Sequence, residues 1–571
     1  WLSGKEHLRQ RAYGPAREAF EACLRKDPHY APALADLAQL RLRSMDPAGA
    51  FDLARRALAI DTYDPAANFA YGLAAAKLGR TADARDGFEV AAQSAELRGA
   101  AFTELARLSV RSGDFDRAAL DAERSLDFNR RNLEALQVLA LARRAHGKRD
   151  EAGVVLDTIL ALDPLSPFAR FERARLTGEQ APMRGFAASF RGEAPQETLL
   201  ELAAWYHGLG RLAETAEVLA VAPPTAEVLY WLARVKDEQG DAQAGPALQK
   251  AEAASPELVF PFRTESAEVL SWAAAKGTSW KAPYYLALVH WGAGKIEEAR
   301  RLLEACGDAP DFAPFYATRA LAFEDVPGGR AAADLERAAR LDPRQWRYGR
   351  MLADRQLAAG HAAKGLATAA DYAARFPASY ILGMLHAKAL LANGRAAEAA
   401  SRLARLNVIP YEGSSEGRRL HREAHQRLAV AALRKGDAAT ARRAVATARL
   451  WPENLGAGKP YESDVDERLE DFLAAQALDR AGRKAEARAL LGKVEASGAR
   501  DRGASALVRA LALRQGGREV AGRTLLADWS AREPGNTVAT WAARAFAGEG
   551  QPPPDRAGED ARVLAAWLAG R

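Results

Sequence analysis

Few residues of this sequence are spaced as a catalytic or metal site requires. His421 and His425 stand one helical turn apart, so both imidazoles would lie on one face of a helix, where they could share a metal ion. The order of residues is H-R-E-A-H rather than the H-E-x-x-H of zinc peptidases, and no third ligand is apparent. We therefore predict no metal site at this pair, and we expect no cofactor elsewhere.

The string GAGK occurs twice and is similar to part of a phosphate-binding loop. Gly456–Lys459 is followed by Pro460, and Gly292–Lys295 is followed by Ile296. A P-loop needs Ser or Thr after the lysine and a further glycine five residues before the final Gly-Lys pair, and both strings lack these residues. Carboxylates are plentiful but scattered over expected helix surfaces. The residues shown predict no catalytic site and no enzyme activity.

Two long segments that depart from a helical pattern are the better candidates for binding. An insertion of eight residues lies within Asn407–Gly417, and a loop of about a dozen residues occupies most of 451–465. Loops of this length bind a ligand or fold over a neighbour as a brace, and the sequence leaves both readings open. Arginines after the insertion suit a carboxylate or phosphate partner, or a surface network of ion pairs. The candidate loop residues are Tyr411, Arg418, Arg419, Trp451, Glu453, Asn454, Lys459 and Tyr461.

The charge balance argues against nucleic acid as a partner. The 80 Lys and Arg residues are interspersed with 74 Asp and Glu residues, which leaves a net charge of +6. We find no basic block and no aromatic RNA-binding signature. We also find no apolar run near the roughly 18 residues that a membrane span needs. Cys23 and Cys306 fall at small-residue positions and are expected to be buried packing thiols, and two cysteines do not settle the redox compartment.

The helices that must position these segments recur with a period of 34 residues. Small residues mark it at Ala16, Ala50, Ala84, Ala118 and Ala152. Glycines lie five residues before three of them, at Gly79, Gly113 and Gly147. Bulky residues follow at four residues, at Phe20, Phe88 and Leu156, and prolines at twelve, at Pro28 and Pro164. Glycine ends a first helix, alanine lets a second helix cross it closely, and proline starts the next unit.

This pattern resembles the tetratricopeptide repeat (TPR) superfamily, whose units are pairs of helices. The resemblance implies an all-α fold, a right-handed α-solenoid of about fourteen helix pairs. Glycine and proline at Gly178, Pro182 and Gly185 interrupt the pattern, which leaves open one array or two lobes that meet near residues 165–195. We expect a regular block at 1–164, degenerate repeats at 165–254, an irregular aromatic-rich connector at 255–281, repeats at 282–406, repeats with the two long loops at 407–547, and a linker with a terminal helix at 548–571.

In this superfamily the first helix of each unit lines a concave groove, and its fifth, ninth and twelfth or thirteenth positions point inward. These positions are occupied here by Gln39, Phe69, Lys77, Thr103, Arg107, Arg111, Gln137 and Arg144. The set is basic and polar around one aromatic, and it lacks the Lys/Asn pattern of repeats that clamp a C-terminal carboxylate. It predicts an acidic or extended peptide, or an acidic face of another domain, as partner.

Several strings resemble the C-terminal repeat half of large bacterial proteins whose N-terminal half is a β-rich domain of unknown function. They are YDPAANFAYGLA, LVFPFR, LLEACGDAPDFAPFY, ILGMLHAKALLANGR and WPENLGAGKPYESDVDERLEDFL. The register of the repeats places Trp1 inside a helix already begun, so we expect the chain to be a fragment. The first functional reading is a non-enzymatic scaffold for a protein or peptide, including its own missing N-terminal domain. The alternatives are an accessory region of a carbohydrate-active enzyme and an acceptor-recruiting array of a glycosyltransferase.

Overall fold

The computed structural model describes residues 1–177, 185–186, 188–326, 329–497 and 503–569, and every regular element in these ranges is a helix. The chain divides into two compact units, Trp1–Phe315 (unit 1) and Tyr316–Arg571 (unit 2), with the boundary inside helix α20 (Ala313–Ala322). A division near residues 165–195 was therefore wrong, since that segment lies within unit 1. Gly178 and Pro182 lie outside the described residues.

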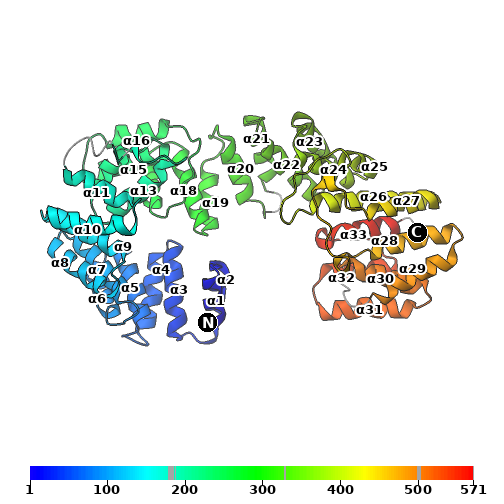
Figure 1. Ribbon diagram of the computed structural model, residues 1–571, viewed down its shortest axis with the longest axis horizontal. Helices are drawn as coiled ribbons and strands as arrows, with labels where there is room; N and C mark the ends of the chain where they lie inside the picture. The colour runs from blue at the N-terminus through cyan, green and yellow to red at the C-terminus, as the bar shows by residue number, and fades with distance from the viewer. Residues whose placement is uncertain (178–184, 187, 327–328, 498–502, 570–571) are drawn as a thin grey trace. The chain divides into compact units, whose positions relative to one another are not determined.

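Unit 1 consists of helix pairs joined by short turns (Figure 1). Its helices are α1 (Leu2–Arg9), α2 (Tyr13–Lys26), α3 (Ala31–Arg43), α4 (Pro47–Leu58), α5 (Pro65–Lys77), α6 (Thr81–Ala91), α7 (Arg98–Arg111), α8 (Phe115–Phe128), α9 (Leu133–Ala145), α10 (Arg149–Leu162), α11 (Pro167–Thr177), α13 (Pro195–Gly208), α14 (Leu212–Ala220), α15 (Ala226–Glu238), α16 (Ala244–Ala253), α17 (Ser266–Lys276), α18 (Lys281–Gly292) and α19 (Ile296–Ala305). Helix α17 occupies part of the expected irregular connector at 255–281, so only its flanks are irregular.

The pair α7–α8 shows how the repeat residues act. Gly113 has φ +78°, a left-handed conformation that ends α7 at little cost. Asp114 then caps α8, because its Oδ1 accepts the backbone N–H of Arg117 at 3.0 Å. Ala118 is completely buried where the two helices cross, as the sequence predicts. The local register of the first block is thus confirmed in this pair.

The neighbouring pair α5–α6 shows why bulky and small residues alternate. Phe88 of α6 is completely buried and faces Gly72 of α5, where an added Cβ would lie 2.6 Å from the ring. Gly87 is equally tight against α5, since its Cβ would lie 2.7 Å from the Asn68 carbonyl oxygen. Because both contacts leave no room for a methyl group, the crossing distance of this pair is set by residue size.

Unit 1 curves until its first repeats meet its last. Figure 1 shows α3 and α4 facing α18 and α19. Lys295, which precedes α19, donates from Nζ to the carbonyl oxygen of Met45 at 3.1 Å. Met45 itself has φ +55° in the turn between α3 and α4. Lys295 is the last residue of one of the two GAGK strings, and its hydrogen bond joins the early and late repeats of unit 1.

Unit 2 continues the same construction and then folds back. Its helices are α21 (Ala331–Leu341), α22 (Trp346–Ala358), α23 (Ala362–Arg375), α24 (Tyr380–Ala392), α25 (Ala396–Leu403), α26 (Glu416–Arg434), α27 (Ala438–Ala448), α28 (Arg468–Arg480), α29 (Lys484–Ala496), α30 (Ala504–Gln515), α31 (Glu519–Arg532), α32 (Thr537–Ala547) and α33 (Gly558–Leu568). After a linker at 548–557, α33 packs on α26 and α30 (Figure 1). The expected terminal helix is present, but it returns into the array.

Candidate functional site

The inner face of unit 1 contains a cavity of about 630 Å³. One wall comes from the α3–α4 turn, α5 and α7, and the opposite wall comes from α13 and α17. Leu42, Leu73 and Leu108 give it an apolar floor. Polar side chains stand around this floor, namely Lys77, Glu104, Arg107, Arg111, His207, Glu265 and Glu268. An apolar base with convergent charged groups is the usual form of a ligand pocket.

The cations on the first wall differ in their partners. Arg107 forms an ion pair with Glu134 and approaches Glu104, with Nε 3.6 Å from Oε2. Burial raises the pKa of Glu104, although Arg107 and Lys77 act against the rise. Lys77 and Arg111 are exposed, and within the described ranges no carboxylate lies at ion-pair distance from either. These two cations are therefore available to a ligand.

The opposite wall is acidic. Glu265 and Glu268 are exposed at the start of α17, and Glu268 lies 3.9 Å from Arg234 as its nearest ion-pair partner. His207 of α13 is engaged already, with Nε2 2.8 Å from Oε2 of Glu238. The cavity thus has a cationic side and an anionic side. The sequence analysis missed the acidic side because it followed groove positions only through the first regular block.

The eight predicted groove residues do not form one surface. Gln39 is exposed, Gln137 is half-buried, and Phe69 packs with its ring centroid 5.7 Å from that of Phe88. Thr103 is buried, and its hydroxyl lies 2.9 Å from that of Ser125 inside the helix pair. The structure brings three of the eight to the cavity, and these three are Lys77, Arg107 and Arg111.

Arg144 is the clearest correction to the predicted groove. Its guanidinium forms an ion pair with Glu172 and donates from Nη2 to Oε1 of Glu214 at 2.9 Å. Tyr206 completes the cluster by donating to Oε1 of Glu172 at 2.6 Å. Burial alone would lower the pKa of Arg144, and the two carboxylates raise it overall. Because its charge is neutralised by residues 28 and 70 positions away, Arg144 holds helices together and offers nothing to a partner.

The two long loops of unit 2 pack against each other as braces. The backbone N–H of Val408 donates to the carbonyl oxygen of Asn454 at 2.8 Å. The Asn454 side chain donates in turn to the Leu406 carbonyl oxygen at 2.8 Å. Arg418 is buried, with its guanidinium carbon 4.6 Å from the Trp451 ring centroid. Between the two readings left open by the sequence, these contacts favour bracing for Arg418, Trp451 and Asn454.

The remaining loop candidates stay at the surface. Tyr411 and Tyr461 are 55% and 83% exposed, and Glu453 is exposed as well. Lys459 lies 3.6 Å from Glu462, within its own loop. Arg419 pairs with Glu559 of the terminal helix instead, at 2.9 Å. The cavity at Arg419 is lined by none of the other four side chains, so a binding role for them stays a prediction.

Two other motifs have a structural explanation in the described parts of the chain. His421 and His425 have ring centroids 4.5 Å apart, and His421 Nε2 lies 3.0 Å from the Thr447 carbonyl oxygen. No cluster of three His, Cys, Asp or Glu that could hold a metal occurs in these parts. Residues 413–417 read G-S-S-E-G, a match to the nucleophile-elbow pattern that the sequence analysis overlooked. That elbow joins a strand to a helix, whereas here a loop leads into α26.

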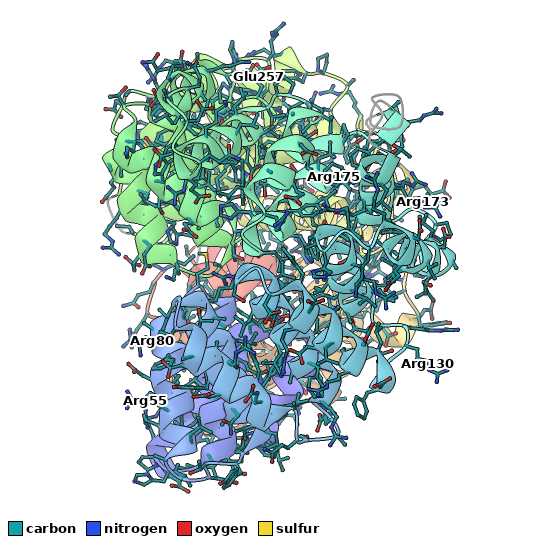
Figure 2. The ribbon with its side chains drawn as sticks, turned by 90° about the vertical axis from the view of Figure 1, so that its left-hand side faces the viewer. Arg55, Arg80, Arg130, Arg173, Arg175 and Glu257 are labelled. Atoms are coloured by element: carbon teal, nitrogen blue, oxygen red, sulfur yellow. The ribbon has the colours of Figure 1, made fainter. Side chains whose placement is uncertain are left out.

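Figure 2 labels several charged residues on one side of unit 1. Arg55, Arg80, Arg130 and Arg173 lie apart at the edges of this view. Arg173 is paired with Asp157 across the neighbouring helices. Among the described residues, no helix is long and apolar enough to cross a membrane.

The comparisons with known proteins found similarity to solved structures alone. No family model and no curated protein matches the chain. Among solved structures, a tetratricopeptide repeat protein from Parabacteroides merdae is 16% identical, and the match covers 48% of this chain and 96% of that one with a TM-score of 0.30. Pseudomonas aeruginosa PilF is 24% identical over 38% of this chain and 94% of that one, with a TM-score of 0.30. YrrB, described as a TPR protein with an unusual peptide-binding site, is 18% identical over 41% and 98%, with a TM-score of 0.25.

Identities and TM-scores this low do not indicate a function. The resemblance to the C-terminal half of one family of large bacterial proteins stays a prediction. The assignment of the repeat rests on the chain itself. The 34-residue period, the left-handed glycines and the buried alanines recur in the first block, and the described chain is helical throughout its regular elements. The helix pairs of this protein resemble tetratricopeptide repeats in these features, and they stack as an all-α solenoid.

Proposed function

We propose that this protein is a non-enzymatic scaffold that binds a segment of a partner protein in the inner cavity of unit 1. The observation that carries the proposal is that Lys77 and Arg111, which have no ion-pair partner among the described residues, lie opposite the carboxylates of Glu265 and Glu268. A cavity with two charged sides over an apolar floor suits an extended peptide. Such a peptide would carry an acidic side chain towards α5 and α7 and a basic one towards α17.

The charge of the cavity favours a peptide of mixed sign over a purely acidic one. The sequence predicts an acidic or extended peptide, or an acidic face of another domain, because the repeat register presents Arg107 and Arg144 as available cations. Arg107 is paired with Glu134, and Arg144 is paired with Glu172 and Glu214. An acidic segment alone would satisfy Lys77 and Arg111 but would face repulsion from α17.

The test is selection of peptides of about twelve residues from a random library by the full chain. Peptides bound in the cavity should lose affinity roughly 5- to 30-fold in Lys77→Glu with Arg111→Glu, since each exposed ion pair contributes up to about 1 kcal/mol. The matched control is Arg130→Glu with Arg131→Glu, two exposed arginines outside the cavity. Selected peptides that bind both double variants as tightly as the parent would move the site elsewhere.

The finer readings extend the same proposal. Should the chain belong to a larger bacterial protein, a segment of its N-terminal domain is a natural occupant of the cavity. Titration of that domain into the parent chain and into the Lys77→Glu, Arg111→Glu variant tests this reading. Arg144 is unsuitable for such a test, because its replacement would break the buried ion pairs with Glu172 and Glu214.

A further inference from the structure

The terminal helix α33 does not extend the stack of helix pairs in unit 2. It packs instead on α26 and α30, and its Trp567 ring meets Phe472 of α28 with centroids 5.0 Å apart. Helices α26, α28 and α30 are each the first helix of a pair, and they lie in a row. We call the face made by these three first helices the inner face of unit 2, and α33 lies against it.

An apolar side of α33 is pressed into this face. Ala561, Val563 and Leu564 are completely buried, and Trp567 is 6% exposed. The spacing Ala561, Leu564, Trp567 places small and large apolar residues on one side of the helix. They share a hydrophobic cluster with residues of α28 and α30. An amphipathic helix laid in a groove through such anchors is a general mode of peptide recognition.

Charged residues of α33 lie opposite residues of the opposite charge on α26. At the start of α33, Glu559 lies 2.9 Å from Arg419 and Asp560 lies 2.5 Å from Arg422. One turn later the signs exchange, and Arg562 of α33 lies 2.8 Å from Glu423.

At the far end, Arg434 donates to the carbonyl oxygen of Ala566. A cation there complements the negative end of the α33 dipole. The residue numbers of the contacting pairs rise together along both helices, so α33 runs parallel to α26. The alternation of charge along α33 selects one register of this packing.

The groove continues beyond α33. A cavity of about 460 Å³ lies between α22, α24, α26 and α33, with Leu357, Leu391 and Leu420 among its lining. Glu559 and Arg562 of α33 form part of its wall. The inner face of unit 2 therefore has room for a longer helix than α33.

The linker to α33 permits its release. Residues 548–557 include Pro552, Pro553 and Pro554, and Gly548 has φ +91°. Trp541 Nε1 anchors the linker by donating to the Gln551 carbonyl oxygen at 3.1 Å. The six residues after that anchor span up to about 20 Å when extended, enough to carry α33 out of the groove.

We propose that the inner face of unit 2 binds an amphipathic helix of a partner protein, and that α33 is an internal ligand which this partner displaces. The partner helix carries acidic residues in its first turn for Arg419 and Arg422. It presents apolar residues at spacings of three, ending in a large aromatic, to Phe472 and the leucines of the open cavity. This site is separate from the cavity of unit 1, so either proposal can fail while the other stands.

The test uses a labelled peptide of residues 556–569 and the full chain. In the variant Glu559→Lys with Arg562→Glu, α33 faces like charges on Arg419 and Glu423, so the groove opens more often. The labelled peptide should bind this variant at least about fivefold more tightly than the parent, measured by fluorescence anisotropy. The matched control is Glu519→Lys with Arg523→Glu, an exposed ion pair of α31 away from α33. The control variant should bind the peptide as weakly as the parent.

Two further measurements keep the result decisive. A peptide with Trp567→Ala should not bind, and amide hydrogens of α33 in the parent should exchange faster than those of α28. Absence of binding to every chain, or equal protection of α33 and α28, would make α33 a permanent part of the fold and overturn the proposal. A variant that doubles in mass without taking up peptide would show that the occupant is α33 of a second copy, which also contradicts a partner helix.

Discussion

The inner faces of the two units differ in what fills them, although both are built from the same repeat. In unit 1 the inner face is an open cavity with Lys77 and Arg111 unpaired within the described chain. In unit 2 the corresponding face holds α33, and Arg419 and Arg422 are paired with its carboxylates. An internal helix thus neutralises cations on the inner face of unit 2, whereas two cations on the inner face of unit 1 have no such partner in the described chain.

The comparison also separates two uses of arginine. Arg422 and Arg144 are both partly buried and bridge carboxylates of other helices, so they support the fold. Lys77 and Arg111 contact no carboxylate in the parts of the chain described above, so they support nothing that folding requires. Substitutions of the bridging arginines should unfold the unit. Substitutions of the two exposed cations should affect binding alone.

The largest effect is expected from Arg144→Met. The substitution leaves the carboxylate of Glu172, about 1% exposed, without its cation, while Glu214 keeps Arg211 at 2.7 Å. Breaking a buried ion pair by removing one partner costs about 3–5 kcal/mol. Guanidinium unfolding followed by circular dichroism should show an earlier transition for unit 1.

Arg143→Met on the same helix is the control for this substitution. Arg143 pairs with Glu123 at 2.7 Å and with Glu151 at 3.5 Å, and both carboxylates are about half exposed. Exposed pairs contribute about 0–1 kcal/mol, so the control should unfold close to the parent. Equal losses from both substitutions would mean that the Arg144 cluster is no more important than a surface pair.

The second effect is a pH response of opposite sign in the two units. Burial raises the pKa of Glu227 in unit 1 to about 7, although the hydrogen bond from Ser266 and the charge of Arg263 act against the rise. In the unfolded chain this pKa is about 4.3. The folded state therefore holds the proton more tightly, and unit 1 loses stability as the pH rises from about 4.3 to about 7, on the order of 3 kcal/mol.

Unit 2 should respond the other way. Burial, together with His421, lowers the pKa of His425 to about 4. The unfolded chain takes up this proton near pH 6.5. Unit 2 is thus most stable above pH 6.5 and loses stability as the pH falls towards 4.

Thermal unfolding of the parent, Glu227→Gln and His425→Gln at pH 4.5, 5.5 and 7 separates the two responses. The first variant should reduce the loss on raising the pH, since Glu104 and Glu217 of unit 1 also have raised pKa values. The second should reduce the loss on lowering the pH, since His421 also has a lowered pKa. A parent pH profile that neither variant alters would refute both assignments.

The third effect concerns the helix crossings that the units share. Ala118 is completely buried between α7 and α8, and Ala118→Leu should overpack the crossing at a cost of about 1–3 kcal/mol. Asp127→Leu, at an exposed position of the same helix, should change the unfolding free energy much less. If Ala118→Leu melts at the temperature of the parent, the crossing is looser than the burial of this alanine indicates.

What the sequence could predict was local. The positions of Ala118 and Gly113 follow from one helix pair, in which a fixed spacing decides which residue turns and which is buried. The same reasoning from the repeat register fails for Arg144. Its register places it on a first helix, but its partners Glu172 and Glu214 come from later units whose approach depends on accumulated rotation between pairs.

The packing of α33 back onto earlier helices cannot be predicted from the sequence, for a related reason. An amphipathic terminal helix and a proline-rich linker are visible in the sequence, but the surface that accepts the helix is made by α26, α28 and α30 together. The contact between Lys295 and Met45 likewise joins residues 250 positions apart. Neither contact has a sequence spacing that the repeat period fixes, so both required the folded structure.

The smallest effect, and the sharpest test of the comparison, is expected from Lys77→Gln with Arg111→Gln. Both side chains are exposed and lie beside the paired Arg107, so removing their charges breaks no ion pair and relieves some repulsion. Surface substitutions of this kind stay within about 0.5 kcal/mol of the parent. In Arg419→Gln of unit 2, loss of the pair with Glu559 should cost up to about 1 kcal/mol and cost less in high salt.

Both variants can be measured by guanidinium unfolding at low and high salt. A loss above about 1 kcal/mol for the unit 1 variant would show that these cations serve folding after all. The inner face of unit 1 would then be a structural surface, and its cavity would lose the property that marks it as a binding site.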